Sequence, residues 1–127
     1  MLSRTRMIVL VGAAAAVLAL AAVSLASGAS HPTLTGVVGK NNAYKITLKT
    51  PKGRLVKTLK AGTYTLVIHD DSAIHNYELD GPHGKSWTFT TVAGTGTKTK
   101  TLKLVAGKYK AYCSAHESMM FQHFTVR

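Results

Sequence analysis

The chain has 127 residues, which is enough for one domain but not for two. It contains a single cysteine, which excludes a disulfide within the chain, and it carries a formal net charge of +11. A strongly basic surface suits acidic partners or an anionic surface. The lysines are scattered along strand-like segments and are not interleaved with aromatic residues, so we do not expect nucleic-acid binding.

Residues 1–29 have the pattern of a secretory signal. Arg4 and Arg6 precede an almost wholly apolar run from Met7 to Ala26, and small residues follow at 26–30. A basic start, an apolar run and small residues are typical of a cleaved signal peptide. The run is also long enough to span a bilayer, so an uncleaved anchor helix over residues 7–26 remains an alternative. Either way, we expect residues 30–127 to form one exported domain, in the periplasm, at the cell surface or outside the cell.

The rest of the chain predicts strands and turns, with no convincing helical period. Apolar and polar residues alternate from Tyr44 through Ile46 to Leu48, which predicts a half-buried strand. Comparable segments lie at 62–69, 75–79, 88–91, 97–104, 108–113 and 121–126. Seven or eight short strands with turn signals between them predict an all-β fold, an antiparallel sandwich or barrel. Lys98 and Lys100 share a face with two leucines, which indicates a sheet edge.

The stretch YCSAHESMMFQHF, residues 112–124, concentrates soft ligands in a short loop between two predicted strands. Cys113 and His116 have the spacing Cys-x-x-His, and Met119 and Met120 follow at once. Thiolate, imidazole and thioether groups select copper or zinc over magnesium or calcium. An unpaired cysteine in an exported chain also favours a bound metal, because a free thiol is a liability in an oxidising compartment.

A trigonal site with two histidines, one cysteine and a weak axial methionine needs a second histidine from elsewhere in the chain. His75 fits best, because it shares a face with Tyr77 and Leu79 and should point inward. His69 should face solvent, and His83 lies in a loop rich in glycine and proline.

The axial ligand must be chosen between two adjacent methionines. Met120 lies on the same strand face as Phe124 and Val126, which should be core, and Met119 then points outward. We therefore expect a metal site made of His75, Cys113, His116 and Met120. For Trp87 and Phe89 we expect core packing.

These residues resemble the plastocyanin/azurin group of cupredoxins, the type 1 blue copper proteins. The resemblance covers about residues 33–127 and rests on His75-Asn76, on Tyr112-Cys113-Ser114-Ala115-His116, and on Met120 before Phe124-Thr125-Val126. It implies a Greek-key β-sandwich, copper as the cofactor, and the same four ligands. It also implies that Asn76 ties the two ligand-bearing loops together by hydrogen bonds, and that the edge of His116 reaches the surface and passes the electron.

The chain departs from the family pattern at three places. Gln122 stands where the family usually has glycine, Ala115 replaces a frequent proline, and the methionine is doubled. None of these changes removes an equatorial ligand.

The predicted function is one-electron transfer between exported redox proteins by a monomer, without enzymatic activity, through partners with an acidic docking surface. One alternative is a copper chaperone, scavenger or sensor on the same fold. A second is a copper site at His31, if processing leaves that histidine near the mature N-terminus. A third, an adhesion or carbohydrate-binding module, leaves the Cys/His/Met cluster unexplained.

Overall fold

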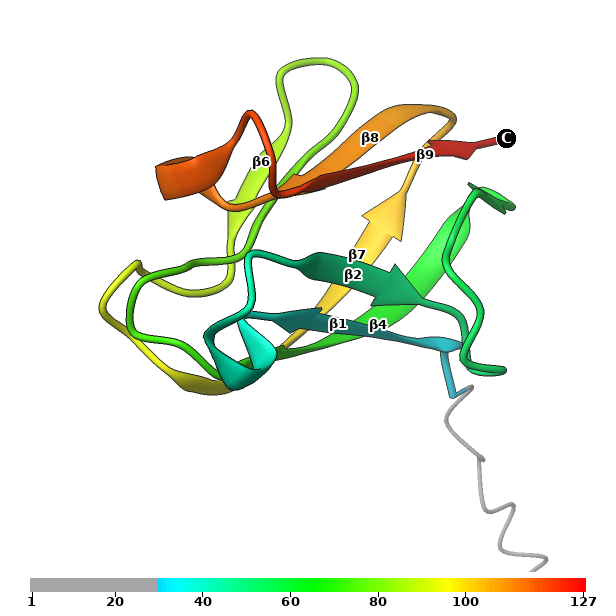
Figure 1. Cartoon of the computed structure of the whole chain (residues 1–127). Coiled ribbons are helices and arrows are strands. Elements are labelled where there is room, and N and C mark those ends of the chain that lie inside the picture. The colour runs from blue at the N-terminus through cyan, green and yellow to red at the C-terminus, as the bar shows by residue number, and fades with distance from the viewer. Residues whose placement is uncertain (1–29) are drawn as a thin grey trace, which may run out of the picture.

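The computed structural model describes residues 30–127 (Figure 1). This part of the chain contains nine β-strands and two short 3-10 turns, joined by loops. Their bounds in chain order are β1 Thr33–Val38, η1 Lys40–Asn42, β2 Ile46–Lys49, β3 Thr58–Leu59, β4 Gly62–Asp70, β5 Glu78–Asp80, β6 Ser86–Thr88, β7 Gly96–Leu104, β8 Gly107–Tyr112, η2 Ser114–His116 and β9 Phe121–Val126. The predicted signal or anchor, residues 1–29, lies outside the described residues. No helix within residues 30–127 is long and apolar enough to cross a membrane.

The strands form two sheets that pack face to face, as the all-β prediction requires. One sheet has the order β2-β1-β4-β7 and the other the order β3-β9-β8-β5-β6. The expected antiparallel arrangement holds for most neighbours, but β1 pairs parallel with β4 and β3 pairs parallel with β9. Both sheets are therefore mixed, and the strand count exceeds the seven or eight that alternation predicted.

Two predictions about strands are confirmed and two are wrong. β9 begins and ends at the predicted residues, and β7, with exposed Lys98 and Lys100, does lie at a sheet edge. The strand predicted at 88–91 instead spans Ser86–Thr88. The strand predicted from Tyr44 begins only at Ile46, because Asn41 and Asn42 have left-handed backbones (φ 56° and 58°) that turn the chain just before it.

The core lies between the sheets and follows the predicted alternation. Leu66 and Ile68 of β4 are fully buried, as are Tyr77 and Leu79 from the opposite sheet. Phe89 is buried and Trp87 is half-buried, stacked on Tyr109, so both are core residues as expected.

One polar side chain links the two sheets. Gln122 of β9 accepts a hydrogen bond at Oε1 from Leu48 N (2.7 Å) of β2. Its Nε2 donates to Leu48 O (3.0 Å) and to Val56 O (2.9 Å). The amide thus bonds the backbone of β2 and of the segment before β3, at the position where the resemblance implies glycine.

Candidate metal centre

The loop after β4 places His75 inside the molecule. Asp70 Oδ1 accepts from Ser72 N (3.1 Å), and the Ser72 hydroxyl donates to Asn42 Oδ1 (3.0 Å). These bonds fix the loop against the turn η1. His75 is fully buried, as predicted, and its Cδ2 lies 3.0 Å from the position that a Cβ on Gly39 would take. Gly39 also has φ 68°, so this close approach depends on glycine.

The loop between β8 and β9 places the other two predicted equatorial ligands. Cys113 directly follows β8 and is fully buried, and its N–H donates to Met120 O (3.1 Å) across the base of the loop. The turn η2 follows, in which His116 N donates to Cys113 O (3.1 Å). Met120 N closes the turn by donating to His116 O (2.9 Å). Backbone hydrogen bonds thus set the spacing of both side chains.

The two loops lie at the same end of the sandwich, on the left in Figure 1. They bring together one ligand atom each from His75, Cys113 and His116. His75 Nδ1 and His116 Nδ1 lie 3.1 Å apart. Cys113 Sγ is 3.9 Å from His75 Nδ1 and 3.7 Å from His116 Nδ1. Within the described residues this is the single group of three or more His, Cys, Asp or Glu side chains placed to hold a metal ion.

The three ligand atoms lie close enough together for a single ion to bond all of them, at the usual lengths of about 2.0 Å to nitrogen and about 2.3 Å to sulfur. Two imidazoles and one thiolate are the donor set of trigonal blue-copper sites, whereas structural zinc sites use four protein ligands. The residues present therefore fit copper.

Asn76 joins the two ligand-bearing loops, as the resemblance implied. Its backbone N–H donates to Cys113 Sγ (3.4 Å), and its Oδ1 accepts from Ser114 N (2.8 Å). Its Nδ2 donates to Glu78 Oε1 (3.0 Å), which sets the orientation of the amide. A hydrogen bond to the sulfur withdraws charge from the thiolate and is one of the means by which a protein tunes a metal centre.

Tyr44 covers the two histidine rings, a role that the sequence did not reveal. Its ring centroid lies 4.8 Å from that of His75 and 4.8 Å from that of His116, with interplanar angles of 76° in both cases. The two imidazoles are themselves 4.8 Å apart at 72°. Alternation predicts Tyr44 on one face with buried Ile46 and Leu48, but its side chain is 54% exposed. The three rings form an aromatic triangle with Tyr44 on the solvent side.

His75 depends on this packing because its other ring nitrogen has no anchor. Its Nε2 is buried and has no hydrogen-bond partner among the described residues. Histidine ligands commonly donate that second N–H to a carboxylate or carbonyl, which fixes the ring. Here the ring contact with Tyr44 helps to orient the imidazole instead.

The two methionines differ in burial as strand parity predicted. Met120 is 1% exposed and belongs to the core cluster, whereas Met119 is 63% exposed. Met120 O accepts from Cys113 N, so its backbone is fixed to the ligand loop. Its assignment as the axial ligand stays a prediction.

The other histidines stay outside the centre. His69 Nδ1 pairs with Thr97 Oγ1 (2.9 Å), and His83 lies in an exposed loop with φ 58°. His31 and His123 are exposed. The selection of His75 over these candidates therefore agrees with the geometry.

Comparison with known proteins identifies the fold. No protein-family model matches the chain, and no curated protein matches it in sequence. Two structures of rusticyanin, a copper protein, match it with a TM-score of 0.51, at 14% and 13% identity, over 75% of this chain and 76% of theirs. Auracyanin A, a "blue" copper protein from the green thermophilic photosynthetic bacterium Chloroflexus aurantiacus, matches at 20% identity with a TM-score of 0.49, over 75% of this chain and 98% of its own. The chain has the cupredoxin fold.

Proposed function

We propose that this protein binds one copper ion through His75, Cys113, His116 and Met120 and carries single electrons between redox proteins. The observation that carries the proposal is the close approach of two Nδ1 atoms and one Sγ, which lie 3.1 Å, 3.7 Å and 3.9 Å from one another. Copper bound there would supply a one-electron Cu(I)/Cu(II) couple. A carrier, unlike an enzyme, needs no substrate pocket at this centre.

The residues of the chain would keep the site the same in both oxidation states. The loop bonds at Cys113, Ser72 and Asn76 hold the ligand backbones, and the aromatic triangle holds the imidazoles. A site that moves little when its charge changes has little to reorganise on electron transfer. Burial of Cys113 and Met120 excludes water from the sulfur side.

The chaperone alternative uses the same ligands but requires that copper leave easily. Two observations favour the carrier: Cys113 is fully buried, and Met120 is 1% exposed. An incoming acceptor thiol could reach neither sulfur without opening the loop. Exposed Met119 is the one soft ligand beside the site that such a partner could meet first.

Titration of the purified protein with Cu(II) tests the proposal. An intense thiolate-to-copper band in the visible spectrum and a reversible redox wave are expected, and Cys113→Ala should abolish both. Cys113→Ala that kept the colour and the wave would overturn the assignment. Rapid copper transfer to a chelating apo-protein, with no reversible wave, would favour the chaperone.

The sequence-based expectations on location and assembly are part of the proposal. Residues 1–29 would direct export or anchor the chain, and residues 30–127 would act as a monomer outside the cytoplasm. Cell fractionation and the N-terminal mass of the recovered protein test both statements. Recovery of the intact chain in the cytoplasm would contradict them.

A further inference from the structure

A hollow of about 210 Å³ lies on the outer face of β1 and β2. Its lining includes three lysines, Lys40, Lys45 and Lys49, each of which is exposed. Val37, Ala43 and Thr47 complete it. Among the described residues that line it there is no acidic side chain, so three ammonium groups share one small concave surface without a counter-charge.

The hollow is joined to the metal centre by one short segment. Ala43 and Lys45, which line it, are the chain neighbours of Tyr44. Tyr44 is 54% exposed, and its ring contacts both His75 and His116. A molecule held by the lysines would therefore lie beside the tyrosine that contacts both imidazole ligands.

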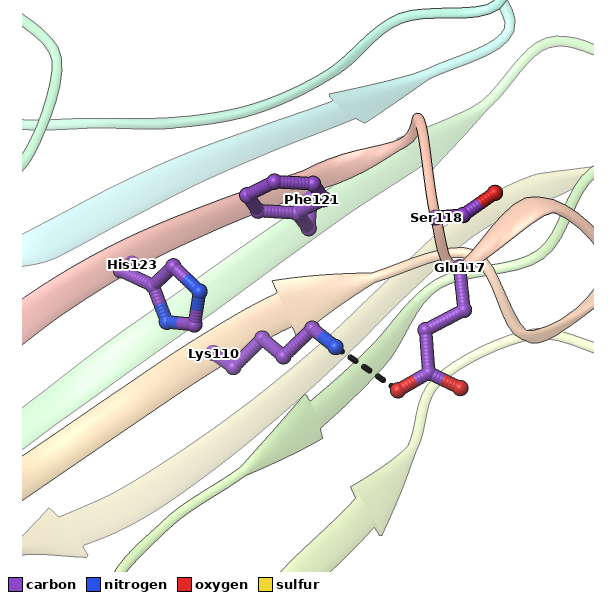
Figure 2. Close-up of a pocket in the computed structure, with 5 residues that line it drawn as sticks. All are labelled: Lys110, Glu117, Ser118, Phe121 and His123. Carbon is purple, nitrogen blue, oxygen red and sulfur yellow. Dashed lines mark hydrogen bonds and ion pairs between the residues drawn. The ribbon is translucent and has the colours of Figure 1, made fainter.

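A second hollow lies beside the loop that follows His116, and its one lysine is not free of a counter-charge. Figure 2 shows it between β8, β9 and the loop after His116, with Lys110, Glu117, Ser118, Phe121 and His123 around it. Lys110 Nζ donates to Glu117 Oε1 at 2.7 Å, so its ammonium group is already paired. Of the two hollows, only the one lined by Lys40, Lys45 and Lys49 has positive charges without an acidic side chain beside them.

We propose that this lysine hollow is the docking site for an acidic patch on the redox partner, with Tyr44 between the partner and the copper ligands. The inference rests on the proposed electron-transfer function and names the surface that would serve it. The docked reaction is one electron leaving Cu(I), which becomes Cu(II), and entering the partner's oxidised one-electron centre. No bond is made or broken and no proton moves.

The test uses an anionic oxidant and two matched triple variants. Hexacyanoferrate(III) accepts one electron from the reduced copper protein and becomes hexacyanoferrate(II), and stopped-flow absorbance follows the return of the visible band. One variant carries Lys40→Gln, Lys45→Gln and Lys49→Gln. The control carries Lys98→Gln, Lys100→Gln and Lys103→Gln on β7, at the opposite edge of the same sheet, with the same loss of charge and equally exposed side chains.

A local docking site predicts that the two variants differ. At low ionic strength the hollow variant should oxidise roughly tenfold more slowly than the parent, and the β7 variant less than about twofold, because local fields steer charged reactants more than net charge does. Added salt should remove the difference in rate between the two variants, because it screens the attraction between the lysines and the oxidant. Hexaglutamate should slow the parent and the β7 variant but not the hollow variant. Equal rates in the two variants, or equal inhibition by hexaglutamate, would overturn the proposal.

Failure of the docking proposal can be told apart from failure of the proposed function. Both variants should keep the parent's visible band and reduction potential, because none of the six lysines contacts a ligand. If the band is present but the rates are equal, the docking site is wrong and the copper carrier stands. If the parent itself shows no band, the copper assignment fails.

Discussion

Tyr44 lies outside the proposed ligand set but contacts two of its members. It belongs to the loop before β2, yet its ring is 4.8 Å from both imidazoles. The two ligands come from different loops, so Tyr44 is a contact that they share. His75 Nε2 has no hydrogen-bond partner among the described residues. The orientation of its imidazole ring therefore depends more on the contacts between rings than it would if that nitrogen were hydrogen-bonded.

Replacing Tyr44 should therefore loosen the site. Each aromatic pair contributes about 0.5–1.5 kcal/mol beyond burial, so Tyr44→Ala should cost the copper-loaded form about 1–3 kcal/mol and speed copper loss to a chelator severalfold. Tyr44→Phe keeps the ring and should behave like the parent. The measurement is the dissociation rate with excess chelator, and Leu55→Ala, at a similarly exposed position, is the control. Equal rates for the Ala and Phe variants would contradict the role of the ring.

Tyr112 precedes Cys113 and lies beside two carboxylates. Its hydroxyl contacts Asp80 Oδ1 (3.4 Å), and Glu78 is its cross-strand neighbour. Desolvation, and then the negative charges of Asp80 and Glu78, raise the pKa of Tyr112 from 10.0 to about 12. The folded state therefore keeps this proton at a pH at which the unfolded chain has released it.

The sign of this shift predicts alkaline instability. Stability from the Tyr112 proton is fully present below about pH 10 and is lost as the pH rises through about 12. Burial raises the pKa of Tyr77 and Tyr109 in the same direction. Thermal unfolding from pH 9 to pH 12 should show a steep fall in Tm, and the fall should be shallower in Tyr112→Phe. An identical slope in the variant would show that other groups cause the loss.

At the scale of strands, the side chain of Gln122 connects the two sheets. β9 pairs parallel with the short β3, and its Gln122 reaches β2 in the opposite sheet. One amide makes three hydrogen bonds to this backbone, and Leu48 O also accepts from Val56 N (2.9 Å). A glycine at this position could not make this link.

Gln122→Met should therefore destabilise the protein without touching a proposed ligand. Loss of three hydrogen bonds, with partly buried backbone groups left unpaired, should lower the free energy of unfolding by about 2–4 kcal/mol. Chemical denaturation measures it, with His123→Ala on the same strand but exposed as the control. The visible band of the folded variant should be unchanged, and a shifted band would mean that β9 has moved Met120.

The elements and the ligand triangle were largely predictable because they follow from local patterns. Cys113 and His116 are three residues apart, so a turn brings them together, and alternation placed His75 and Met120 inward. Tyr44 could not be predicted, since the left-handed Asn41 and Asn42 break the alternation that assigned it to a buried face. The Gln122 link and the two parallel pairings depend on contacts between distant segments, which residue patterns do not encode.

At the scale of the whole molecule, the proposed copper should act as a stabilising ligand. Ligands held by two separate loops exist together only in the folded state, so binding favours that state. Copper at about 100 times its dissociation constant should add about 2.7 kcal/mol. For a domain of this size that corresponds to a rise in Tm of roughly 10–20 °C. Calorimetry with and without copper measures the rise, which Cys113→Ser should remove, and an equal rise in that variant would place the copper elsewhere.

The strand order has a consequence for the time at which the centre can form. β1 lies between β2 and β4, so the first strand described waits for residues up to Asp70 before it has both neighbours. Cys113 and His116 are then fixed by a loop that only β9 closes. A chain that emerges from the ribosome amino end first therefore exposes His75 long before it can present the thiolate. The proposed metal site would therefore form only after β9 has been synthesised. A chain that stops before β9 could not form it.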